Sequence, residues 1–176
     1  MSTAPQTNIF PQRVDPRKLA NQGVDLSGQI TPDQCTRLVD AVVKIVAPIT
    51  VLLAFGRNES GRRVVTGSAT AEVAVACQRC LEPIPVALAA ELAVVIVWSD
   101  DQARSLPKGD DAWIVEENSA DIIALVEEEL LLALPIVSYH PGDECSITTG
   151  FGVDSELDTK QASRKNPFEI LGQLKH

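Results

Sequence analysis

Hydrophobic and polar positions follow an extended pattern through the centre of the chain. Ile49–Arg57 is apolar and ends at the turn sequence Asn58–Gly61, and Arg62–Ala76 then alternates residue by residue. Val86–Trp98 forms a third extended run. Successive strands joined by short turns are typical of antiparallel neighbours. The pattern predicts a β meander, either open or curled into a partly closed barrel.

A first helix is predicted before these strands. Thr31 can cap it, Pro32 suits the first helical position, and Gln34 can complete a capping box. An apolar stripe then continues towards Pro48, which should end the helix. The stripe consists of Leu38, Val39, Val42, Val43 and Val46.

A second helix is predicted after the strands, with its start at Asn118 or Ser119 and its end at Pro135. Asp121 falls in the first turn, where the helix dipole favours a negative charge. Glu127–Glu129 is expected to face mostly water. The apolar stripe of this helix consists of Ile122, Ile123, Val126, Leu130 and Leu134.

The remaining segments complete the expected organisation. Residues 99–118 are acidic and are predicted to form an exposed loop, and residues 1–149 a single α+β domain. Residues 150–176 are predicted to be a mobile linker followed by a short amphipathic helix that docks on the body or on a partner. The fold class is therefore α+β, with two main helices, a meander or partly closed barrel, and a short C-terminal helix. The residues predicted for docking are Asn166, Pro167, Phe168 and Leu171.

Charge is distributed unevenly along the chain. The formal net charge is −9, but residues 100–129 contain ten acidic and two basic side chains. The first half is nearly neutral and contains arginines near its turns, which are candidates for contact with RNA phosphates or for ordinary solubilising charge. Aromatic residues make up only 4% of the chain, so any RNA contact should be mainly electrostatic. The candidate contact residues are Arg57, Arg62, Arg63, Arg79, Arg164 and Lys165.

Three of the four cysteines fall in a pattern that predicts a metal site. Cys77 and Cys80 form a CxxC pair, and His140 and Cys145 supply two more ligands. Soft thiolates and one imidazole suit a tetrahedral zinc ion, and four protein ligands would make that ion structural. The alternative is that these thiols pack in loops without a metal. Cys35 is interpreted as a structural or surface thiol.

Enzyme signatures are absent from the sequence. There is no GxSxG, GxxxxGK[ST], GxGxxG or HExxH motif. A thioredoxin-type role for Cys77 and Cys80 would need a helix directly after the motif, whereas Pro83 and Pro85 introduce a further strand. The sequence therefore predicts a protein that is not an enzyme.

Several separated stretches resemble the YceD-like family, which is linked to accumulation of large-subunit (23S) ribosomal RNA. Their order and spacing match from about residue 13 to 175. The resemblance implies a bacterial-type cytoplasmic protein, with a plastid counterpart, that supports processing or stability of this RNA, and it implies no catalytic residues. The stretches are Ile30–Gln34, Cys77–Cys80, Asp121–Val137, His140–Cys145 and Asn166–Leu171.

Two functional hypotheses follow. The first is a non-catalytic ribosome biogenesis factor that contacts large-subunit rRNA directly or through ribosomal or assembly proteins. The second is a zinc-stabilised acidic adapter that binds a basic ribosomal or assembly protein without touching RNA. A hydrolase that uses Glu127–Glu129, or Asp110 and Asp111, is a less favoured third reading. No apolar run is long enough for a membrane span and no secretory signal is visible, so the expected location is the cytoplasm, without membrane or DNA partners.

Overall fold

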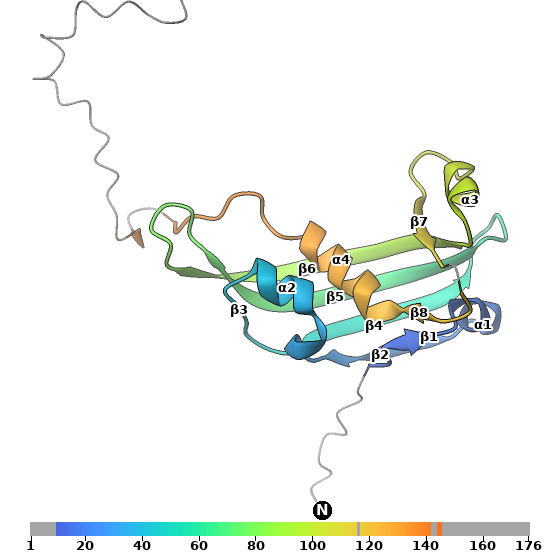
Figure 1. Cartoon of the computed structure of the whole chain (residues 1–176), viewed down its shortest axis with the longest axis horizontal. Helices are drawn as coiled ribbons and strands as arrows, with labels where there is room; N and C mark the ends of the chain where they lie inside the picture. Colours follow the sequence, from blue (N-terminus) through green and yellow to red (C-terminus); the bar gives the residue numbers. More distant parts are fainter. Residues whose placement is uncertain (1–9, 116, 142–143, 146–176) are drawn as a thin grey trace, which may run out of the picture.

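Three long antiparallel strands form the centre of the molecule (Figure 1). The computed structural model describes residues 10–115, 117–141 and 144–145. Within these residues the chain has an α+β fold. Its elements are β1 (Arg13–Val14), α1 (Pro16–Gln22), β2 (Asp25–Ile30), a 3₁₀ turn (Pro32–Gln34), α2 (Thr36–Ala41), β3 (Lys44–Ile45), β4 (Ile49–Arg57), β5 (Arg63–Ala76), β6 (Pro83–Val97), α3 (Asp100–Arg104), β7 (Asp111–Ile114), β8 (Ala120–Asp121) and α4 (Ile122–Leu132).

The predicted meander is confirmed. Strands β4, β5 and β6 are consecutive antiparallel neighbours, so that Val65 of β5 lies opposite Phe55 of β4 and Val94 of β6. The path of the main sheet runs β2-β4-β5-β6-β7, and β3 pairs with β5. Its ends are not joined, so among the described residues the sheet is an open meander and not a closed barrel.

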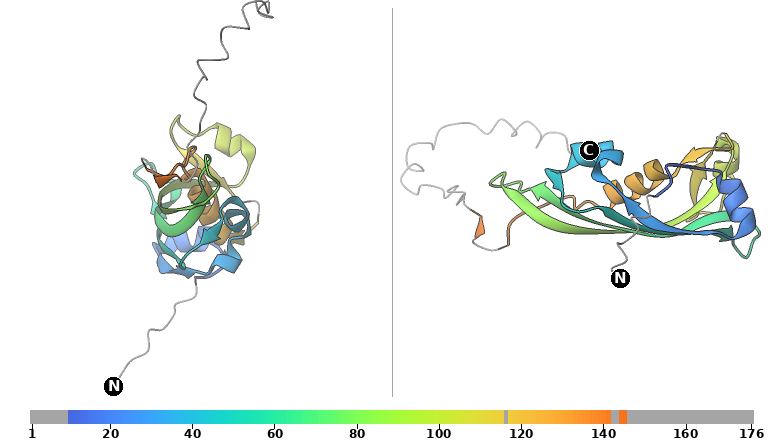
Figure 2. Two further views of the ribbon diagram at one scale, coloured as in Figure 1. Left: turned by 90° about the vertical axis from the view of Figure 1, so that its left-hand side faces the viewer. Right: turned by 90° about the horizontal axis from the view of Figure 1, so that it is seen from below.

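One face of this sheet carries the core. In β4, Ile49, Val51, Leu53 and Phe55 are buried, while the residues between them are exposed. Helices α2 and α4 lie over the same face, as the two views of Figures 1 and 2 show. This arrangement explains the alternating pattern of the strands, because every second side chain points towards the helices.

Gly67 is the one position where two strands of the meander cannot accept a side chain. A Cβ atom placed there would lie 2.0 Å from the carbonyl oxygen of Leu52 and 2.9 Å from the Cα atom of Leu53. Both are backbone atoms of the neighbouring strand β4, which cannot move aside without breaking the pairing. The glycine therefore allows β4 and β5 to approach closely at this point.

The first predicted helix is much shorter than expected. The capping box at Thr31 and Gln34 is present, but it opens a 3₁₀ turn, and α2 ends at Ala41. Beyond it the chain joins the sheet, where the N–H of Val43 donates to the carbonyl of Ala74 at 2.8 Å. The prediction that the helix continues towards Pro48 was wrong, because the β-branched valines of its apolar stripe fit a strand equally well. The exposed members of that stripe are Val39, Val43 and Val46.

The acidic segment 99–118 is not simply a loop. It contains α3 and the strand β7, which pairs in parallel with β6 so that Trp113 lies opposite Ile96. A four-residue strand leaves little periodic signal, and only the exposed edge of β6 determines that it forms. Four α-helices are therefore present among the described residues, rather than two main ones.

Helix α4 begins later than predicted and buries one of its acids. Asp121 is the N-cap, and its carboxylate accepts a hydrogen bond from the N–H of Ala124 at 3.0 Å. The helix ends at Leu132, before Pro135. Glu127 is only 5% exposed, so the expectation that it faces water was wrong, whereas Glu128 is exposed.

Some expectations fall outside the described residues. These are the C-terminal helix with Asn166, Pro167, Phe168 and Leu171, and the domain boundary at residue 149, which stay predictions. Among the helices that the structure describes, none is long and apolar enough to cross a membrane.

Candidate metal centre and basic surface

Three cysteines and one histidine converge at one end of the sheet. The ligand atoms of Cys77, Cys80, His140 and Cys145 all lie within 4.8 Å of one another, and we call these four residues the Cys₃His cluster. Sγ of Cys77 lies 3.9 Å from Sγ of Cys145, and Sγ of Cys80 lies 3.3 Å from Nδ1 of His140. The fold thus brings together two pairs that are separated by 59 residues of sequence (81–139).

The CxxC pair lies in the hairpin loop between β5 and β6. The N–H of Cys77 donates to the carbonyl of Glu82 at 2.9 Å, and the N–H of Leu81 donates to the carbonyl of Cys77 at the same distance. Leu81 has a φ of 65°, a left-handed conformation that lets the chain turn back towards β6. The loop holds both thiols on its inner side, where each is buried.

A second set of hydrogen bonds attaches the segment after α4 to this loop. The N–H of Gln78 donates to the carbonyl of Ser138 at 2.9 Å, and the Gln78 side chain donates to the carbonyl of Ile136 at 3.2 Å. These bonds bring His140 against the CxxC pair. The histidine is half-buried, whereas Cys145 is buried.

The dimensions of the cluster fit a tetrahedral zinc ion. Two thiolates bound at the usual zinc distance are roughly 3.8 Å apart, and a thiolate and an imidazole nitrogen roughly 3.6 Å apart. The separations of 3.9 Å and 3.3 Å are close to these values. None of the cysteines forms a disulfide, which would need a separation of about 2 Å between sulfurs.

The environment of Cys77 favours the thiolate. Burial on its own raises the pKa of the Cys77 thiol, but backbone hydrogen bonds from Cys80, Arg79 and His140, with the His140 side chain, outweigh burial and lower the pKa to about 5. A thiolate is the form that binds metal. The site differs from a thioredoxin-type motif because strand β6, and not a helix, follows the CxxC pair.

Two of the candidate RNA-contact arginines lie side by side at the opposite end of the sheet. Arg57 and Arg63 flank the turn between β4 and β5, and both donate to the side-chain oxygen of Asn21 in α1, at 2.9 and 3.1 Å. Arg57 also donates to the carbonyl of Gly61 at 2.8 Å. Within the described chain, neither guanidinium group forms an ion pair. Two positive charges are thus held together with no carboxylate partner among the residues that the structure describes.

The other candidate arginines have different surroundings. Arg62 forms an ion pair with Asp110 at 3.2 Å, which neutralises it locally. Arg79 lies in the hairpin loop between β5 and β6, with its guanidinium carbon 5.1 Å from the centre of the Tyr139 ring. The 14 residues of β5 separate Arg63 from this loop, a span of roughly 45 Å. Arg79 therefore does not belong to the same surface, and Arg164 and Lys165 lie outside the described residues.

Sequence reasoning missed several residues near the paired arginines. Arg17 in α1 lies over the ring of Trp98, 5.0 Å from its centre. Arg13 donates to the side chain and the backbone carbonyl of Ser119 at 3.1 and 3.3 Å. Arg17 and Asn21 are four residues apart on a helix, a spacing that was visible in the sequence once residues 16–22 were assigned as helix.

Comparison with known proteins places this chain in a family. A family model described as "Large ribosomal RNA subunit accumulation protein YceD" matches residues 65–175. A protein of that name from Haemophilus influenzae is 34% identical over 167 residues, which cover 94% of this chain and 96% of the relative. The chain belongs to the YceD family. No solved structure matches it.

Proposed function

We propose that this protein is a non-catalytic, cytoplasmic ribosome biogenesis factor that supports processing or stability, and so accumulation, of 23S rRNA. The family to which the chain belongs is described by accumulation of the large ribosomal RNA subunit. The Haemophilus relative has the same description, and its match to this chain covers nearly the full length of both proteins. The sequence also lacks the motifs of common enzyme classes.

The observation that supports direct RNA contact is that Arg57 and Arg63 lie side by side. Their guanidinium groups share the neutral oxygen of Asn21 and have no carboxylate to neutralise them in the described part of the chain. Guanidinium groups donate hydrogen bonds to phosphate oxygens in a fixed planar geometry, so two adjacent ones suit an RNA backbone. The surrounding charge of the chain is negative, which confines phosphate binding to such a local surface.

We also propose that the Cys₃His cluster binds one structural zinc ion. The separations of 3.9 Å between the sulfurs of Cys77 and Cys145 and of 3.3 Å between Cys80 and His140 support this, and the cluster links the β5–β6 loop to the segment after α4. All four zinc positions would be filled by protein, so the ion would stabilise this end of the sheet rather than activate a substrate.

The first experiment is ultraviolet crosslinking in cells followed by sequencing of the RNA recovered with the protein. We expect reads concentrated at one region of 23S rRNA. The double variant Arg57→Gln, Arg63→Gln should lose most of these reads, and in filter binding to the recovered region its salt dependence should weaken by a slope of about 2, one for each phosphate contact.

The matched control is Lys44→Gln, which removes an exposed positive charge from β3, far from the paired arginines. It should leave crosslinking and the salt slope nearly unchanged. If the unmodified protein recovers no 23S rRNA but co-purifies with assembly proteins, direct RNA contact is wrong. In that case the acidic adapter becomes the better description.

A further inference from the structure

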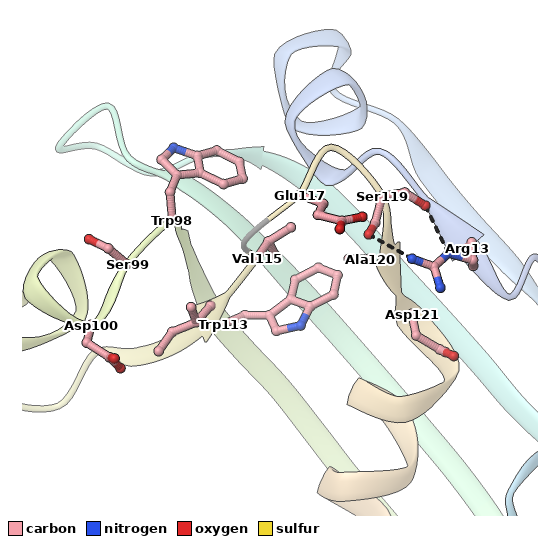
Figure 3. A pocket seen from close by; sticks show the side chains of 11 residues that line it. Arg13, Trp98, Ser99, Asp100, Trp113, Val115, Glu117, Ser119, Ala120 and Asp121 are labelled. Carbon is pink, nitrogen blue, oxygen red and sulfur yellow. Dashed lines mark hydrogen bonds between the residues drawn. The ribbon is translucent and has the colours of Figure 1, made fainter.

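An open cleft of about 830 Å³ lies beside the end of the sheet that carries the paired arginines. We call it the indole cleft, because Trp98 and Trp113 line it, and these are the only two tryptophans of the chain. Figure 3 shows both rings together with Glu117, Asp121 and the guanidinium group of Arg13 around the same opening. Nothing in the proposed RNA contact uses this cleft.

The two indole rings are held by the sheet. Trp113 belongs to β7, and Trp98 directly follows β6, the strand with which β7 pairs. Both side chains are half-buried and pack against the core. The rings are therefore fixed in position, so binding a ligand there would cost little side-chain entropy.

The charges at the cleft favour a cationic ligand. Asp100, Glu117 and Asp121 line it together with Arg13, and Arg17 adds a second positive charge over the ring of Trp98. Asp121 is occupied as the cap of α4, and Arg13 donates to Ser119. The carboxylates of Asp100 and Glu117 are exposed, and within the described chain neither forms a hydrogen bond or an ion pair.

The molecule already shows that one of these rings accepts a guanidinium group. Arg17 lies over Trp98 at 5.0 Å, within the range of a cation–π interaction. Three of the side chains that line the cleft, Asp100, Glu117 and Asp121, are carboxylates. A phosphate-bearing ligand would be repelled by the same carboxylates.

We propose that the indole cleft binds an arginine or lysine side chain from a basic segment of a protein partner. The cation would lie against the indole of Trp113 and be neutralised by Asp100 and Glu117. This inference goes beyond the proposed RNA contact and does not depend on it, since the paired arginines and the cleft carry opposite charge.

The test uses the intrinsic fluorescence of the full-length protein. Since both tryptophans line the cleft, any occupant should change the emission directly. The probe is a peptide of alternating glycine and arginine, and the comparison probe alternates glycine and glutamate. We expect a saturable change with the arginine peptide that weakens as salt rises, and none with the glutamate peptide.

Two sets of variants assign the binding. The double variant Asp100→Asn, Glu117→Gln should weaken binding of the arginine peptide about threefold to tenfold, whereas Glu91→Gln, which removes an exposed carboxylate from the middle of β6, should not. Trp113→Phe should weaken binding less than the double carboxylate variant, and its circular dichroism and melting temperature verify that it is folded.

Two results would overturn the proposal. One is equal binding of the arginine peptide by the double carboxylate variant and the unmodified protein. The other is a fluorescence change produced by a single-stranded RNA oligomer and not by the peptide, which would make the cleft a base-stacking site. Crosslinking of 23S rRNA should stay unchanged in the cleft variants, so failure here is separate from failure of the RNA contact.

Discussion

The carboxylate of Glu127 in α4 accepts a hydrogen bond from the backbone N–H of Leu38 in α2, at 2.9 Å. Leu38 is the third residue of α2, where an N–H group has no partner within its own helix. Arg37 lies 3.5 Å from the other oxygen of the same carboxylate. Glu127 therefore caps one helix from another and fixes the two helices over the sheet.

Removing this cap should destabilise the protein. Glu127→Ala leaves the buried N–H of Leu38 without an acceptor, and we expect the free energy of unfolding to fall by about 2 kcal/mol. Glu127→Gln keeps an acceptor oxygen and should cost about half as much. Urea unfolding measures both. Glu128→Ala, one residue further and exposed, is the control and should change stability by less than about 0.5 kcal/mol. Equal effects at the two positions would contradict the capping role.

Gly67→Ala should be among the most damaging single-methyl additions in the sheet. The added Cβ would overlap the backbone of Leu52 and Leu53, and relief requires separation of β4 from β5. We expect a loss of about 3 kcal/mol in thermal or urea unfolding. Gly56→Ala, in β4, is the matched control because nothing lies within 4 Å of its added Cβ. A stable Gly67→Ala variant would show that the two strands do not approach so closely.

The buried thiol of Cys35 should make stability depend on alkaline pH. Burial, together with the smaller effect of the charges of Glu127, Asp121 and Asp33, raises the pKa of Cys35 to about 12. Above pH 9 the unfolded chain loses this proton while the folded chain keeps it, so stability falls as the pH rises. The folded state should lose about 1 kcal/mol through this group between pH 8 and pH 10.

Urea unfolding at the two pH values tests this prediction. Cys35→Ala removes the titrating group, so the difference between the two pH values should be about 1 kcal/mol smaller in the variant than in the unmodified protein. The comparison cancels the titration of all other groups. An identical pH dependence would show that Cys35 ionises normally in the folded state.

Metal removal should act on one end of the sheet. We expect about one zinc ion per chain in freshly purified protein, because the four ligands form one tetrahedral site. Chelation should lower the unfolding temperature by about 10 °C. Cys77→Ser should lose the ion, whereas Cys35→Ala should keep it, because Cys35 lies outside the cluster. Zinc far below one per chain, with unchanged folding of Cys77→Ser, would exclude the metal.

Local sequence signals determined the parts of this fold whose pattern is long and regular. The meander from Ile49 to Val97, the turn at Asn58–Gly61 and the existence of α4 all followed from periodicity and turn residues. The four residues of the Cys₃His cluster were grouped in the sequence by residue type and by the CxxC spacing, and the structure brings their ligand atoms within 4.8 Å of one another. Family resemblance was visible in the same motifs.

Short and ambiguous segments depended on tertiary contacts. Val42–Val46 has a pattern that suits helix or strand, and only pairing with β5 made Lys44–Ile45 within it a strand. The four residues of β7 gave no periodic signal and were decided by pairing with β6. Glu127 looks like its solvated neighbours in sequence, and becomes a buried cap only because α2 presents an unpaired N–H to it.

The sequence by itself thus determined the type of fold and the chemistry of the candidate metal ligands, because periodicity and side-chain chemistry are local properties. The tertiary structure alone decided which charges are neutralised and which remain available. It joined Arg57 and Arg63 on Asn21, paired Arg62 with Asp110, and brought the two tryptophans to one cleft. These outcomes depend on distances between residues that are far apart in the chain, and such distances exist only once the sheet is assembled.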